Sequence, residues 1–137
     1  MSTPVAIRFD DDLLAEVRSV AKSRSMSVSA VIQMFTDEGI KALKVPGIIF
    51  RDGAVGRRPA VAGCMDVWKL MSTVKINEDD QTLQEIADYY ELPVHFFETA
   101  VEYHRLYTKE IDDWIAEHYR SNNEAYEAWL SQQEASA

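Results

Sequence analysis

The sequence contains little of what stabilises secreted proteins or anchors proteins in membranes. Its 137 residues include a single cysteine, Cys64, so no disulfide can form within the chain. No apolar run approaches the roughly 20 residues that a membrane-spanning helix needs. The first residues lack the apolar core behind basic residues that marks a signal peptide. These absences predict a globular protein of the reducing cytoplasm, with no membrane partner.

Groups that would support catalysis are also missing. The histidines, His95, His104 and His118, are spread over the predicted helices without a set of cysteines beside them, so no metal site is expected. The segment GAVGRR, residues 53–58, lacks the Lys-Ser/Thr pair of a phosphate-binding loop. The sequence therefore predicts a protein that is not an enzyme and that uses no cofactor or metal.

Charge is distributed unevenly along the chain, whose formal net charge is −9. Residues 1–62 contain nine Lys and Arg against seven Asp and Glu, whereas the remaining residues contain five and sixteen. A slightly basic first part can approach the phosphates of DNA, and an acidic second part can bind a basic protein. This asymmetry is typical of a regulator with two different partners.

The first 43 residues carry the clearest structural pattern. Val5, Ile7 and Phe9 alternate with less apolar residues, which predicts a short strand. Apolar residues then recur with helical spacing over 11–25, and again after Ser27, the expected N-cap of a second helix. A lone strand leaves its backbone polar groups without partners, so we expect it to pair with the same strand of a second copy.

The segments VAIRFDDDLLAEV and SMSVSAVIQMFTDEGI resemble the ribbon-helix-helix family, which includes the Arc and MetJ repressors. This resemblance implies an intertwined dimer whose two-stranded ribbon enters the major groove of DNA, with phosphate contacts at the start of the second helix. The DNA-binding residues that it implies are Thr3, Pro4, Ala6, Arg8, Ser27 and Ser29. Arg8 suits the guanine O6 and N7 acceptors, and Ala6 suits a thymine methyl group. The alternative is an ordinary small domain in which Arg8 is merely solvated.

The middle of the chain reads as a short strand followed by a loop. Ile48 to Phe50 form the expected strand, and Asp52-Gly53 a turn. In the expected loop, 55–63, Arg57 and Arg58 are either solvated or in contact with the DNA backbone.

From Asp66 onward the apolar spacing predicts four helices. Asp66 is the expected cap of the first, and Thr82 forms a capping box with Glu85 in the second. The expected ranges are 67–75, 83–90, 94–107 and 109–120. The second and third have helix-turn-helix proportions, but residues 81–119 carry nine acidic and two basic side chains, so we expect DNA to repel them.

A second resemblance covers residues 47–115. GRRPAVAGCMDVWKLM and TLQEIADYYELPVHFFETAVEYHRLYTKEIDDWI are similar to a small domain of uncharacterised function that occurs in bacterial antitoxins. The resemblance implies a toxin-antitoxin operon, often with a nuclease of PIN-like fold beside it.

The last segment, 121–137, loses clear periodicity and combines glutamates with Tyr126, Trp129 and Leu130. Aromatic anchors with acidic neighbours suit a segment that folds onto a basic groove. Resemblance to antitoxins implies that these three residues bind the toxin. The alternative is that they continue the last helix and pack against their own chain.

Together these patterns predict a mainly α fold: a ribbon-helix-helix intertwined dimer (1–45), a helical domain with a helix-turn-helix-like pair (46–120) and an acidic-aromatic tail (121–137). The predicted function is that of an antitoxin of a type II toxin-antitoxin system. It would be a homodimer that neutralises its cognate toxin and represses its own operon by binding operator DNA. The alternative is a stand-alone ribbon-helix-helix transcriptional regulator of a plasmid or phage.

Overall fold

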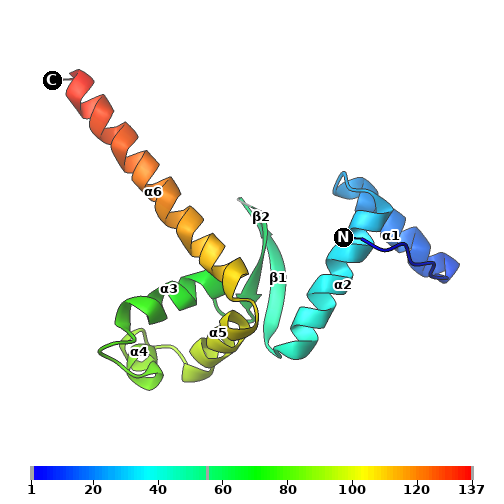
Figure 1. Ribbon diagram of the computed structural model, residues 1–137, viewed down its shortest axis with the longest axis horizontal. Helices are drawn as coiled ribbons and strands as arrows, with labels where there is room; N and C mark the ends of the chain where they lie inside the picture. The colour runs from blue at the N-terminus through cyan, green and yellow to red at the C-terminus, as the bar shows by residue number, and fades with distance from the viewer. Residues whose placement is uncertain (1, 55, 137) are drawn as a thin grey trace. The chain divides into compact units, whose positions relative to one another are not determined.

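The computed structural model describes residues 2–54 and 56–136, which form six helices and two strands (Figure 1). Val55, at the start of the expected loop, and Ala137, at the end of the expected tail, lie outside the described residues. The chain divides into two compact units between Leu43 and Lys44. The prediction of a mainly helical protein is confirmed, and the intertwined dimer stays a prediction.

The N-terminal unit contains two helices, α1 (Asp11–Ser23) and most of α2 (Val28–Lys44). Acidic side chains in the first turn of α1 and Lys22 in its last turn suit the helix dipole. The predicted cap of α2 is confirmed, because the Ala30 backbone N–H donates to Ser27 Oγ at 3.0 Å. Residues 2–10 have no regular secondary structure in the single chain, so the expected strand 5–9 is not formed there.

This unit buries little apolar surface by itself. Among its described residues only Ala21 and Val31 are fully buried. Large apolar side chains of both helices and of the N-terminal segment are exposed: Val5, Ile7, Leu13, Phe35, Ile40 and Leu43. A domain that leaves so much of its apolar surface in water needs a cover for it.

The C-terminal unit begins with a hairpin rather than with one strand and a loop. β1 (Ile48–Gly53) pairs antiparallel with β2 (Gly56–Val61), in a register that places Arg51 opposite Arg58. The expected loop 55–63 is therefore wrong over 56–61. The run Arg57-Arg58-Pro59 hides the strand, because it lacks the alternation that usually reveals one.

Four helices follow: α3 (Val67–Asn77), α4 (Leu83–Tyr89), α5 (Val94–Leu106) and α6 (Thr108–Ser136). The predicted capping box at the start of α4 is confirmed: Glu85 N–H donates to Thr82 Oγ1, and Thr82 N–H donates to a Glu85 carboxylate oxygen. The largest fully buried side chains of this core are Tyr103, Phe97, Leu70, Ile86 and Ile111.

The last helix differs most from the sequence-based expectation. We expected a helix over 109–120 and a tail without periodicity, whereas α6 runs without a break to Ser136. Figure 1 shows its second half extending away from α3, α4 and α5. No helix in the described part of the chain is both long enough and apolar enough to cross a membrane.

Candidate functional site

The N-terminal segment presents the residues that the ribbon-helix-helix resemblance assigns to DNA. Thr3, Pro4, Ala6 and Arg8 are all exposed. The residues between them are exposed too, with Val5 at 76% and Ile7 at 63%. The separation into an outward and an inward face therefore requires a second strand, and the described part of the single chain pairs no strand with this segment.

The start of α2 presents two exposed serines. Ser27 Oγ is occupied as the cap acceptor, and Ser29 Oγ accepts a hydrogen bond from Gln33 Nε2 at 3.3 Å. The backbone N–H groups of the first helical turn have no partner within the helix and carry partial positive charge. This end of α2 has the backbone geometry that favours an anion.

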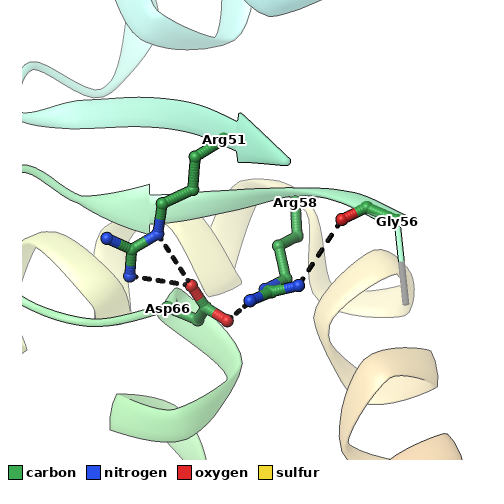
Figure 2. A network of polar contacts seen from close by, with 4 residues as sticks. All are labelled: Arg51, Gly56, Arg58 and Asp66. Carbon is green, nitrogen blue, oxygen red and sulfur yellow. Dashed lines mark hydrogen bonds and ion pairs between the residues drawn. The ribbon is translucent and has the colours of Figure 1, made fainter. Parts of the chain in front are cut away.

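Arg57 and Arg58 are placed differently from the expectation of a solvated or DNA-contacting loop. Both lie in β2, with side chains about one-fifth exposed. Arg57 Nη1 lies 3.4 Å from an Asp52 carboxylate oxygen. Arg58 Nε donates to Asp66 Oδ2, and its Nη1 to the Gly56 carbonyl at 3.5 Å (Figure 2). Arg58 thus binds partners within the protein, and its contact with DNA stays a prediction.

Asp66 is the centre of this hairpin network. Its side chain is 2% exposed, and Oδ1 accepts from Arg51 Nε at 3.2 Å and from Arg51 Nη2 at 3.0 Å. Figure 2 shows Arg51 and Arg58 converging on the two carboxylate oxygens. Asp66 stands at the N-cap position of α3, as predicted, but its side chain makes no capping hydrogen bond. Its carboxylate joins the hairpin to the start of α3 instead.

The charge state of Asp66 follows from these contacts. Burial by itself raises the pKa of the carboxyl group. The hydrogen bonds and charges of Arg51 and Arg58 outweigh burial, so the pKa of Asp66 is lowered overall. A buried charge of this kind is tolerated because it is fully paired.

A second polar cluster ties α3, α5 and α6 together. Asp112 Oδ1 lies 2.5 Å from Lys75 Nζ and 2.9 Å from His104 Nε2. These two hydrogen bonds, that of Lys75 first, lower the pKa of Asp112. Nearby, Tyr103 OH donates to the Glu110 carboxylate at 2.9 Å. The cluster holds the first turns of α6 on the core.

Beside this cluster a groove of about 360 Å³ lies between α3, α4 and α5. Its lining is mainly apolar, and its rim includes Lys75 and His104, which Asp112 already binds. Among residues 2–54 and 56–136, no group of three or more His, Cys, Asp or Glu side chains could hold a metal ion.

The residues expected to bind a toxin lie on the second half of α6. Tyr126 is 60% exposed and Trp129 is 52% exposed, and their rings stack with centroids 6.1 Å apart. Leu130 is partly exposed beside them. They continue the last helix, as the alternative interpretation proposed, but they do not pack against the core.

No family model, no curated protein and no solved structure matches this chain. The functional interpretation therefore depends on the site residues themselves. The hairpin network is the feature that sequence reasoning missed. The sequence signals this network only by the arginines of the hairpin, which precede an acidic residue at the expected start of a helix. Arg51 and Arg58 reach Asp66 together because the register of β1 and β2 places them opposite each other.

Proposed function

We propose that the protein is an antitoxin: a DNA-binding homodimer that holds a toxin with its acidic C-terminal helix. The observation that carries this proposal is the exposed, aromatic and acidic second half of α6. Tyr and Trp are the residues that contribute most to protein interfaces, and here two of them stack in solvent. An exposed cluster of this kind is costly for a protein without a partner.

The N-terminal unit supports the DNA-binding part of the proposal. A second copy would cover Val5, Ile7 and the exposed apolar face of α2, and would give the 4–9 segment a partner strand. The outward residues of that ribbon would then be Pro4, Ala6 and Arg8, and Arg8 is the base-reading side chain among them.

The test is co-expression with the protein encoded by the neighbouring reading frame. We expect that protein to stop growth when produced alone, and growth to return when this chain is produced with it. The triple change Y126A/W129A/L130A should abolish the rescue and co-purification. A matched triple change on the opposite face, S121A/E124A/S131A, should retain the aromatic anchor and weaken binding less.

The DNA-binding part is tested separately. We expect the dimer to retard DNA from upstream of its own gene, and Arg8→Ala to lower the affinity about tenfold, as expected for loss of one bidentate base contact. Repression and DNA binding together with a harmless neighbouring protein would instead favour a stand-alone transcriptional regulator. The exposed N-terminal unit by itself supports that second function.

A further inference from the structure

The second half of α6 is exposed on every side, since residues 116–136 all lie open to solvent. From Ser121 to Ser136 it would extend about 24 Å, at 1.5 Å per residue. Figure 1 shows this part of α6 beyond the core of its unit. An isolated helix of this length is marginal in water, so its order must come from elsewhere.

The exposed face of α6 continues the face that joins the core. Ile111 is buried, and Ile115, four residues on, is half-buried. Tyr119, Tyr126 and Leu130 follow at spacings of four and seven residues, which keep them on the same side of a helix. The apolar stripe thus begins in the core and continues past it without a cover.

The direction of α6 is fixed by contacts with one side of α3, which we call the α3–α6 seam. Trp68 packs against His118 with ring centroids 4.5 Å apart and ring planes tilted by 40°, and Ser72 Oγ lies 3.2 Å from Tyr119 OH. Lys75 completes the seam through its ion pair with Asp112. These contacts join three successive turns of α3 to residues 112–119 of α6.

Ion pairs along α6 reinforce the helix where it leaves the core. Arg120 binds Glu117, one turn before it, and Glu124, one turn after it, the latter at 2.5 Å. Such i,i+3 and i,i+4 pairs support a helix. The docked first half provides the nucleus that an isolated segment would lack.

The charge of this half identifies the kind of surface that it fits. Residues 121–136 contain Glu124, Glu127 and Glu134 and no Lys or Arg. Glu127 and Glu134 are seven residues apart, so they lie above one another along one edge of the apolar stripe, next to Leu130. A second copy of α6 would bring these carboxylates together, whereas a basic edge would pair with them.

We infer that the second half of α6 is a preformed helix that docks into an apolar groove with a basic edge on a partner protein, and that the α3–α6 seam sets its direction. This mode is recognition of a helix in a groove, with anchors one and two turns apart. It differs from folding of a disordered tail on binding, because the segment is already helical in the free protein and loses little further conformational entropy when it binds. The inference rests on the proposed function in one respect, since the partner would be the toxin.

The partner is identified by cross-linking in the host cell. A photoreactive residue at Trp129 should capture a protein through an apolar segment flanked by Lys or Arg. The same residue at Ser131, on the opposite side of the helix, is the matched control and should capture much less. Capture of a second copy of this chain alone, or no capture above the control, would overturn the inference.

The acidic edge is tested with the captured protein. We expect E127K/E134K to weaken binding about tenfold or more, as expected for reversal of rim charges, and E124K to weaken it far less. Equal losses would overturn the basic edge. If the captured protein does not impair growth, the antitoxin proposal fails while the docking mode stands.

The preformed helix and the seam are tested in the free protein. Amide exchange over 121–136 should be slower than in an unstructured peptide, and exchange at the rate of such a peptide would overturn the inference. Spin labels at Gln84 and Gln132, in a C64S background, should give a narrow distance distribution. Trp68→Ala and Lys75→Met should broaden it, and Trp68→Phe should restore it; an unchanged distribution would exclude the seam as the positioning element.

Discussion

At the scale of single residues, Asp66 has a different role from the one that its sequence position suggests. An Asp before a run of apolar residues predicts a helix cap, and the prediction of position is correct. The carboxylate nevertheless turns to Arg51 and Arg58, which lie 15 and 8 residues earlier in the chain. Their approach depends on the pairing of β1 with β2, so no local pattern at Asp66 could reveal it.

We expect Asp66→Asn to lower the free energy of unfolding by about 2–3 kcal/mol, because it leaves two partly buried arginines with a neutral partner. The estimate lies below the usual cost of breaking a fully buried pair, since the Arg51 side chain is 43% exposed. Urea denaturation followed by circular dichroism measures the change. Asp113→Asn, which removes a partner of Lys109 whose side chain is 65% exposed, is the control and should cause no measurable loss.

The difference in the free energy of unfolding between wild type and Asp66→Asn should also depend on pH. The pKa of Asp66 is lower in the folded state than the ordinary value of 3.8, so the folded state binds this proton less readily than the unfolded state does. The ionised Asp66 therefore contributes fully to the free energy of unfolding above pH about 4. That contribution is lost as the pH falls through the pKa of Asp66 in the folded state. The difference in stability between wild type and Asp66→Asn should shrink over that range, and a difference that is constant down to pH 2 would contradict this assignment.

At the scale of elements, local signals identified the helices better than the strands. Thr82 and Glu85 fixed the start of α4, and Ser27 fixed the start of α2, because capping is a contact between near neighbours. β2 was missed because its residues do not alternate, and the length of α6 was missed because its second half has only a narrow apolar stripe. The expected strand 5–9 has no partner strand among residues 2–54 and 56–136 of the single chain.

We expect Thr82→Ala to destabilise the C-terminal unit by about 1 kcal/mol, because the change removes both the cap of α4 and the hydroxyl that positions Glu85. Thermal unfolding monitored by circular dichroism measures it. Thr73→Ala, which removes a hydroxyl bonded only within α3, is the matched control. A loss at Thr73 as large as at Thr82 would mean that the capping box contributes nothing of its own.

At the scale of the whole molecule, the two units differ in how complete they are. The C-terminal unit has a continuous buried core that includes hairpin and helical residues, such as Ile48, Leu70 and Phe97. The N-terminal unit leaves most of its large apolar side chains exposed. We therefore expect the stability of the first unit, and not that of the second, to depend on protein concentration.

A pair of substitutions at neighbouring positions tests this dependence. Ile7→Ser should give a monomer in light scattering and remove the concentration dependence of the first unfolding transition, since it takes an apolar residue from the proposed ribbon core. Ala6→Ser changes the preceding residue, whose side chain has the opposite orientation in a strand, and should leave the dimer intact. A dimer that tolerates both changes would place the interface elsewhere in the chain.

The position of Trp129 on α6 also has a spectroscopic consequence. The chain has three tryptophans, of which Trp68 and Trp114 are half-buried in the C-terminal unit, whereas Trp129 lies in the open. Its fluorescence should therefore be emitted at longer wavelength and be quenched more readily by acrylamide than that of the other two. Binding along the stripe would shift the emission to the blue and protect it from quencher, so the protein carries its own optical reporter of occupancy and needs no attached dye.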